Sequence, residues 1–322
     1  MREDSLPFKH IRLLGHGSLG TVDEVELAKS ACRLARKSIR LAGASREFYM
    51  NIVEKEVRAL KRLSHQHIVR LAGTYECKPF YAILMLPVGK RNLKEFLEEI
   101  DDRNSKAEEL RWLKKWFVCL SSVLAYIHGE GVRHEDIKPS NIIHRGCDIF
   151  LTDFSSCTEF GYGATTSTES PAVITRKYCA PEALQHGMRH GLGSDIFSLG
   201  CVFAEMATVI EGRAVAKLYE FCSTDKRGVT SNGKQYYSNA LDRVDQWFNN
   251  AFYTDCIKPM LAKDRKSRPT ARVVVGWMKS KFPVIDRCSC SEKLFPIQPS
   301  VSTDLEGVNK GLMRGLVKRF IA

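Results

Sequence analysis

Residues 134–141 read His-Glu-Asp-Ile-Lys-Pro-Ser-Asn, and the triplet Asp153-Phe154-Ser155 follows after a short apolar run. The first stretch places Asp136 two residues before Lys138 and five before Asn141. Phosphoryl transfer from a nucleotide needs a carboxylate that orients the attacking hydroxyl and a cation that neutralises the moving group. It also needs amide and carboxylate oxygens that hold Mg²⁺. The two motifs together supply these residue types, so they point to phosphoryl-transfer chemistry.

A glycine-rich loop lies upstream, at Gly15-His16-Gly17-Ser18-Leu19-Gly20. Both flanks, residues 11–14 and 22–27, have the pattern of strands, whereas a dinucleotide-binding fold would place such a loop between a strand and a helix. A strand–loop–strand arrangement predicts a flap over phosphates, because glycine lets the backbone turn tightly and approach a ligand without a Cβ. Taken alone, this glycine spacing is a weak signal.

A lysine and a glutamate follow on neighbouring predicted elements. Residues 32–37 continue as a strand that ends in Lys37, and residues 46–63 have helical periodicity. The predicted apolar face of that helix comprises Phe48, Ile52, Val53, Val57, Leu60 and Leu63. Glu56 lies beside this face, where its carboxylate can pair with Lys37 and aim the ammonium at a phosphate. Each residue by itself is better explained as a solvated surface charge.

The remaining pattern predicts two more strands and then a mostly helical region. The strands are expected at residues 67–71 and 80–86, and the second ends at Pro87, which suits a hinge. Helices are expected at 93–100, 110–127 and 256–261, at 273–278, and from about Gly193 to Val209, the last capped by Ser194 or Asp195. A short hairpin is expected around Arg145-Gly146, a mobile Ser/Thr/Gly-rich loop at 155–178, and an inserted loop at 222–239.

Taken in order along the chain, these motifs resemble those of the eukaryotic protein kinase family over about residues 8–283. Further matches are Val22 after the third glycine, the triplet Ala180-Pro181-Glu182, the D-x-x-S-x-G pattern at 195–200, and Arg268 near the end. The resemblance implies an α+β, bilobal fold for a kinase domain at 1–283. A small lobe at about 8–86 would hold an antiparallel sheet plus one helix, and a larger, mostly helical lobe would span about 90–283. Residues 284–322 would be a C-terminal extension of unknown role.

The resemblance also implies roles for single residues. Asp136 would be the catalytic base, Lys138 would stabilise the transferring phosphoryl group, and Asn141 and Asp153 would hold Mg²⁺. Arg268 would pair with Glu182, and His134, Phe154, Leu60 and Leu71 would stack as a spine anchored by Asp195. ATP would be held by Gly15, Gly17, Gly20, Val22, Ala35, Lys37, Glu56, Met85, Leu86, Val88 and Ile143. Because Lys138 follows the base by two residues, the implied reaction transfers the γ-phosphoryl of MgATP to Ser/Thr hydroxyls of protein substrates.

Two residues depart from the family pattern. Glu135 stands where the family most often has an arginine that binds a phosphate on the loop downstream, and a glutamate would repel that phosphate. We therefore expect activation not to depend on this contact, although Thr165, Thr166, Ser167, Thr168 and Ser170 are candidate phosphosites. Ser155 replaces a glycine and should restrict the motion of its loop. Two alternatives stay open: a pseudokinase that acts as a nucleotide-binding scaffold, and a small-molecule phosphotransferase of similar fold.

Composition limits the remaining classes. The 322 residues carry a net charge of +12, but the basic residues are spread along the chain without a nucleic-acid-binding motif, so no specific nucleic-acid partner is expected. No apolar run of about 20 residues predicts a transmembrane segment. The 11 cysteines form no disulfide framework, which favours a cytoplasmic or nuclear protein. The basic tail ends in an apolar face at Leu312, Leu316, Val317 and Phe320. That face is compatible with partner docking, with a membrane-surface helix or with a frayed end.

Overall fold

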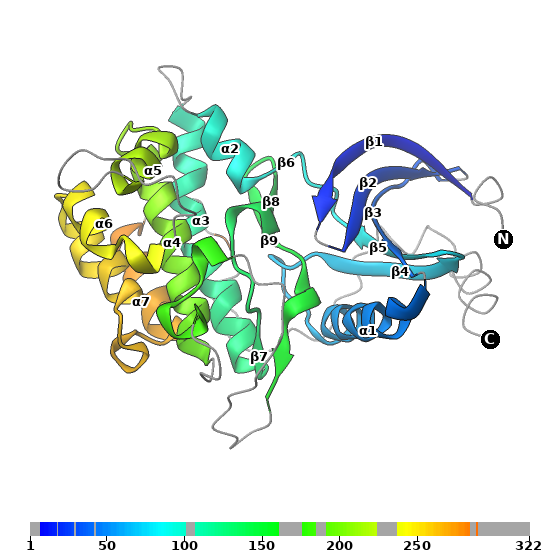
Figure 1. Ribbon diagram of the computed structural model, residues 1–322. Coiled ribbons are helices and arrows are strands. Elements are labelled where there is room, and N and C mark those ends of the chain that lie inside the picture. Colours follow the sequence, from blue (N-terminus) through cyan, green and yellow to red (C-terminus); the bar gives the residue numbers. More distant parts are fainter. Residues whose placement is uncertain are drawn as a thin grey trace. The chain divides into compact units, whose positions relative to one another are not determined.

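The computed structural model describes residues 7–17, 19–28, 30–41, 43–100, 107–160, 176–184, 191–223, 237–283 and 288. These residues form two compact units that meet in the sequence between Lys90 and Arg91 (Figure 1). The small unit is an antiparallel sheet with one long helix, and the large unit is mostly helical. The predicted α+β, two-lobed fold class is therefore confirmed.

The described part of the small unit holds five strands and one α-helix. In chain order they are β1 (Phe8–Gly17), β2 (Gly20–Leu27), β3 (Arg33–Arg40), α1 (Arg46–Arg62), β4 (Arg70–Cys77) and β5 (Phe80–Leu86). The sheet order is β1-β2-β3-β5-β4, and every neighbouring pair is antiparallel. Alternate residues point to opposite faces of a strand. One apolar cluster on this sheet comprises Val25, Leu34, Tyr75, Cys77, Ala82 and Leu84.

The large unit holds the remaining described elements. They are β6 (Arg91–Asn92), α2 (Leu93–Glu99), α3 (Ala107–Gly129), β7 (Val132–Arg133), β8 (Ile142–Arg145), β9 (Asp148–Leu151), β10 (Thr158–Glu159), α4 (Leu192–Ile210), α5 (Val215–Ser223), α6 (Leu241–Trp247) and α7 (Ala271–Lys281). Short turns of 3-10 or π-helix connect several of them. The small sheets are β6-β8-β9 and β10-β7.

Helix α4 forms the centre of the large unit. Most of its residues are buried, and Phe203 packs against Phe117 of α3 with ring centroids 4.7 Å apart. Phe117 also contacts Phe252 and Phe282, so aromatic side chains from distant segments surround one ring. By length and composition α4 could cross a membrane, but 89% of its apolar window is buried inside the structure. Burial within the helical core therefore accounts for its composition.

Three local expectations were wrong. Strand β4 begins at Arg70 rather than at residue 67, and Ile68 and Val69 are buried outside the strand. Phe48 is 51% exposed and does not join the buried face of α1. Helix α4 begins at Leu192 after Gly191, so Ser194 and Asp195 lie inside its first turn rather than at its cap. Their side chains are used in tertiary hydrogen bonds instead.

Two helices, α5 and α6, were not predicted from the sequence. The predicted hairpin at residues 142–151 is confirmed as β8 and β9. The candidate phosphosites at residues 165–170, the tail helix and the extension, apart from Cys288, lie outside the described residues.

Candidate active site

The glycine loop of the small unit is the hairpin that joins β1 to β2. A Cβ on Gly15 would meet nothing within 4 Å, and one on Gly17 would make only an ordinary contact with the Gly20 carbonyl oxygen. By contrast, a Cβ on Gly20 would lie 2.0 Å from the carbonyl oxygen of Ser38. The packing of β2 on β3 therefore explains Gly20 alone. The open backbone at Gly15 and Gly17 suits close approach of a ligand such as a phosphate chain.

Lys37 and Glu56 form a buried ion pair in the small unit. The Lys37 Nζ lies 2.7 Å and 3.0 Å from the two carboxylate oxygens of Glu56. Their side chains are 6% and 0% exposed, so this is not the solvated pair of charges that each residue alone would suggest. The register of the sheet brings Val22, Ala35 and Met85, which were predicted to contact the nucleotide, to the same face as Lys37. Lys37 lies opposite Val22, and Ala35 lies opposite Met85.

The other predicted nucleotide contacts lie near the unit boundary or in the large unit. Leu86 is the last residue of β5, and Val88 follows it, and both are half-buried. Ile143 lies in β8 of the large unit, opposite Phe150 and Asn92. Each unit thus carries its own share of the predicted nucleotide-binding residues.

The loop after β7 gathers Asp136, Lys138 and Asn141 into one hydrogen-bonded cluster. Lys138 Nζ donates to Asp136 Oδ2 at 2.7 Å. Asn141 Nδ2 lies 2.9 Å from the same carboxylate oxygen and 2.9 Å from the Asp136 carbonyl oxygen. The Asn141 amide therefore fixes both the backbone and the side chain of Asp136. Its oxygen, Oδ1, is not used in these bonds.

Asp195 of α4 holds the backbone of this loop. Its two carboxylate oxygens accept the amides of His134 and Glu135, each at 2.9 Å, and His128 Nε2 lies 2.9 Å from Oδ2. Burial raises the pKa of Asp195, but the hydrogen bonds from His128 and His134 outweigh burial and hold the pKa below its ordinary value. Asp195 is therefore an ionised anchor, as the resemblance implied.

The Asp153-Phe154-Ser155 triplet is tied to the same loop. Thr152, which precedes it, donates its amide to the Asn141 carbonyl oxygen at 3.0 Å and accepts from His134 Nε2 at 3.1 Å. Phe154 is fully buried, and its ring centroid lies 4.8 Å from that of His134. Asp153 has a left-handed backbone with φ of 63°, which is rare for a residue with a side chain.

Ser155 contributes a hydrogen bond that sequence reasoning missed. Its hydroxyl donates to Asp153 Oδ1 at 2.7 Å. A glycine at this position could not make the bond. The substitution therefore adds a partner for the carboxylate, besides restricting the backbone as expected.

Glu135 has an internal partner that sequence reasoning also missed. Arg133 Nε lies 3.3 Å from Glu135 Oε1, and the two side chains are 0% and 7% exposed. Glu135 is held with φ of 63°. The opposite charges two residues apart in the sequence were the available signal, but the left-handed backbone at Glu135 could not be foreseen from them. The carboxylate therefore neutralises a buried arginine of its own loop.

Glu182 and Arg268 form the predicted pair across the large unit. Arg268 donates to both carboxylate oxygens, at 2.7 Å and 2.8 Å, and Ser194 donates to one of them at 2.9 Å. Burial raises the pKa of Glu182, but the Arg268 guanidinium outweighs it and holds the pKa below its ordinary value of 4.5. This bidentate pair fastens the segment that follows the Ser/Thr-rich stretch to the start of α4.

Comparison with known proteins agrees with this geometry. Residues 8–277 match the model of the protein kinase domain. The chain is also 28% identical, over 251 residues, to "Cell division control protein 2 homolog 1" of Trypanosoma brucei brucei, a match that covers 74% of this chain and 80% of the relative. Together with the buried lysine–glutamate pair and the Asp136 cluster, the match over most of the chain shows that this protein belongs to the protein kinase family.

Proposed function

We propose that the chain is an active kinase that transfers the γ-phosphoryl group of MgATP to serine or threonine hydroxyls of protein substrates. The observation that carries the proposal is the cluster of Asp136, Lys138 and Asn141. It combines a carboxylate that can accept the proton of a hydroxyl with an adjacent ammonium that can neutralise charge on the transferred group. Because the ammonium lies 2.7 Å from the carboxylate, both groups reach the same reacting atoms.

The residues present fit the nucleotide and the metal. Lys37, held by Glu56, would bind phosphate oxygens, and the open backbone at Gly15 and Gly17 would approach them. Asn141 and Asp153 would hold the metal through oxygen atoms, which Mg²⁺ prefers. When bound, MgATP supplies the phosphoryl group and a divalent charge that offsets the negative charge of the phosphates. The protein's own part is to orient the hydroxyl at Asp136 and to hold its cations in place.

Specificity for serine and threonine is supported by Lys138, which the resemblance associates with this class. The pseudokinase alternative is less well supported, because the groups that transfer requires are all present and both Lys138 and Asn141 are hydrogen-bonded to Asp136. The small-molecule phosphotransferase is disfavoured by the Glu182–Arg268 pair, which anchors a segment suited to a protein substrate.

The test is incorporation of labelled phosphate from ATP with Mg²⁺ into a generic Ser/Thr protein substrate. We expect Asp136→Asn to lower the rate by about two to four orders of magnitude, the usual contribution of a general base. Asp148→Asn is the matched control, because Asp148 is an exposed residue at the start of β9 whose side-chain hydrogen bonds, among the described residues, are to Lys115 and Cys147. That control should keep wild-type activity.

Two results would contradict the proposal. Nucleotide binding without transfer by the wild-type chain would favour a scaffold. Equal activity of Asp136→Asn and the wild type would show that this carboxylate does not serve the reaction.

A further inference from the structure

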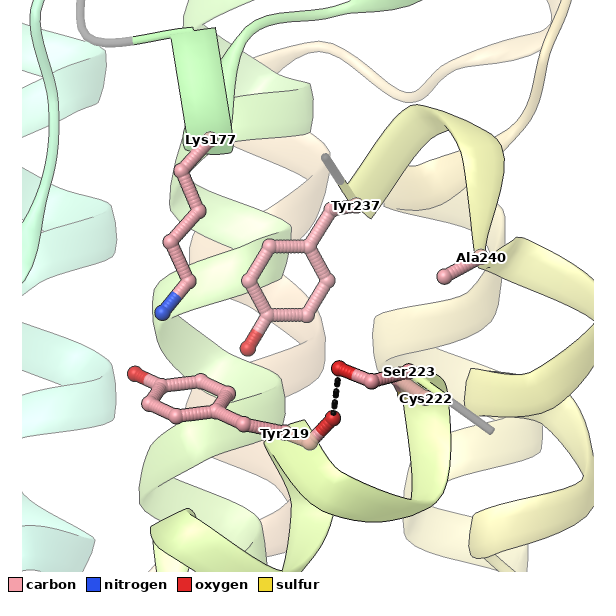
Figure 2. A pocket seen from close by; sticks show the side chains of 6 residues that line it. All are labelled: Lys177, Tyr219, Cys222, Ser223, Tyr237 and Ala240. Carbon is pink, nitrogen blue, oxygen red and sulfur yellow. Dashed lines mark hydrogen bonds between the residues drawn. The ribbon is translucent and has the colours of Figure 1, made fainter. Parts of the chain in front are cut away.

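A cavity of about 200 Å³ lies in the large unit beside α5. Among the described residues it is lined by Lys177, Tyr219, Cys222, Ser223, Tyr237 and Ala240. Figure 2 shows the Lys177 side chain extending toward the ring of Tyr219, with the Tyr237 ring beside it and Cys222 and Ser223 across the space. None of these residues belongs to the catalytic cluster described above, so the cavity is a separate feature of the fold.

Lys177 brings a positive charge to this cavity. Its ammonium lies 3.1 Å from the centroid of the Tyr219 ring and 5.5 Å from that of Tyr178. In the part of the chain that the structure describes, no carboxylate lies within ion-pair distance of Lys177. Burial lowers the pKa of Lys177 below its ordinary value, although Glu205 opposes this shift. An anion bound beside the ammonium would offset that cost of burial.

The carboxylate of Glu205, which acts on Lys177, is buried beneath tyrosine hydroxyls. Glu205 of α4 is 1% exposed, and its Oε1 accepts hydroxyls of Tyr178, Tyr219 and Tyr237 at 2.8–3.0 Å. Burial raises the pKa of Glu205, against the opposing effects of Lys177 and the three hydroxyls. Glu205 does not line the cavity, whereas Lys177 does. The charge presented to a ligand is therefore positive.

Other charges near Lys177 do not change this sign. Lys94 and Glu98 of α2 also act on the Lys177 ammonium. They pair with each other at 3.7 Å and so contribute little net charge.

Helix α4 contacts both the residues beside the cavity and the loop that carries Asp136, Lys138 and Asn141, which we call the catalytic loop. Asp195 holds that loop, Ser198 donates to the Tyr178 carbonyl oxygen at 2.9 Å, and Glu205 binds the Tyr178 hydroxyl. Asp195 and Glu205 are ten residues apart on one helix, which corresponds to about 15 Å. An extended peptide covers that distance in about four or five residues. This separation along α4 sets the scale, about four or five extended residues, on which a peptide with its hydroxyl at Asp136 would meet the cavity.

We propose that Lys177 and the cavity beside it form a subsite for an acidic side chain of the protein substrate, about four or five residues from the phosphorylated residue. This proposal rests on the proposed kinase function and names the class of substrate. Lys177 would be a specificity residue: it favours binding of peptides with aspartate or glutamate at the matching position and takes no part in transfer itself.

The test uses synthetic serine peptides that carry one glutamate, moved in turn from six residues before to six residues after the serine. Matched glutamine peptides show the effect of charge. We expect the glutamate peptide to exceed its glutamine partner in kcat/KM by about tenfold at the matching position, the size of a partly buried charged contact. The gain should lie in KM, with kcat unchanged.

Variants separate the charge of Lys177 from its bulk. Lys177→Met should lower the glutamate/glutamine ratio to about one, and Lys177→Arg should keep most of it. The matched control is Lys258→Met in the same unit, because Lys258 pairs with Asp245 at 2.9 Å and should leave the ratio unchanged. Circular dichroism verifies that each variant is folded, and the arginine variant provides a test if the methionine variant is not.

A wild-type ratio near one at every position would overturn the proposal, as would a preference that survives in Lys177→Met. If no peptide is phosphorylated at all, the proposed function fails instead. Binding of fluorescein-labelled glutamate and glutamine peptides, followed by anisotropy, then decides the subsite. Tighter binding of the glutamate peptide that is lost in Lys177→Met would support it, and equal binding would overturn it.

Discussion

Replacing Arg268 with alanine should destabilise the large unit severely. The change removes both hydrogen bonds to the Glu182 carboxylate and leaves Ser194 as its one side-chain donor among the residues that the structure describes. Because Glu182 is 7% exposed, water cannot easily replace the guanidinium. Breaking a buried ion pair by removing one partner costs about 3–5 kcal/mol. That is a large fraction of the stability of an ordinary domain, which is about 5–15 kcal/mol.

The assay is equilibrium urea unfolding followed by tryptophan fluorescence. All four tryptophans, at residues 112, 116, 247 and 277, belong to the large unit, so the signal reports on that unit. With a slope of about 2 kcal/mol per molar urea, the expected loss lowers the midpoint by about 1.5–2.5 M. The double variant Glu182→Gln/Arg268→Met removes both charges and should recover the part of the loss that comes from the unpaired carboxylate. The carbonyl oxygens of Gly193, Ala262 and Lys263 still lose their Arg268 donor, so recovery should be partial.

The stability of the wild type and that of Arg268→Ala should depend on pH in different directions. In the wild type the folded-state pKa of Glu182 lies below 4.5, so its contribution to stability is present above that pH and is lost as the pH falls through the folded pKa. Without Arg268, burial raises the folded-state pKa above the unfolded value. The variant's deficit should then shrink as the pH falls through the raised pKa. A loss below about 1 kcal/mol at neutral pH would refute the reasoning, because a buried bidentate pair costs more than that to break.

Two further predictions concern the candidate site. Gly20→Ala should loosen the β2–β3 pairing by about 1–3 kcal/mol, because its Cβ would lie 2.0 Å from the Ser38 carbonyl oxygen. Faster hydrogen exchange in those strands would reveal this, whereas Gly15→Ala, with open space around its Cβ, should leave exchange unchanged. Ser155→Ala should remove the hydrogen bond to Asp153 and raise the Mg²⁺ concentration needed for half-maximal thermal stabilisation by the nucleotide, by up to about tenfold. Ser155→Thr should restore it, and an identical Mg²⁺ requirement in the alanine variant would show that the hydroxyl does not position the carboxylate.

The local sequence pattern predicted the bounds of an element well where the spacing of its apolar residues matches the residues that are buried. Strand β5 runs from Phe80 to Leu86 as expected, and α1 differs from the expected helix by one residue at its end. The start of β4 was misplaced because Ile68 and Val69 are apolar and buried, yet Ile68 forms only an isolated bridge and the continuous ladder with β5 begins at Arg70. An apolar run indicates burial, and only the partner strand decides whether it is a strand.

The prediction that Ser194 or Asp195 caps α4 was wrong for a related reason. Ser194 and Asp195 are good capping residues by type, yet Ser194 donates to Glu182 and Asp195 accepts the amides of the catalytic loop. A side chain has few hydrogen-bonding groups, so a side chain that bonds to a distant segment is not free to cap its own helix. That choice depends on segments about 12 and 60 residues away in the sequence, beyond the reach of local propensity.

Residue type and order alone were enough to indicate the family, through the succession of the glycine loop, Lys37, Glu56, Asp136 and Asp153. These follow from residue type and spacing, which are properties of the chain alone. Only the tertiary structure decided how the charges are balanced. It paired Glu135 with Arg133, gave Asp153 a hydroxyl partner in Ser155, and left Lys177 to line a cavity that the buried Glu205 does not line. Burial and the sign of a local field depend on every element packed around a group, and folding alone brings those elements together.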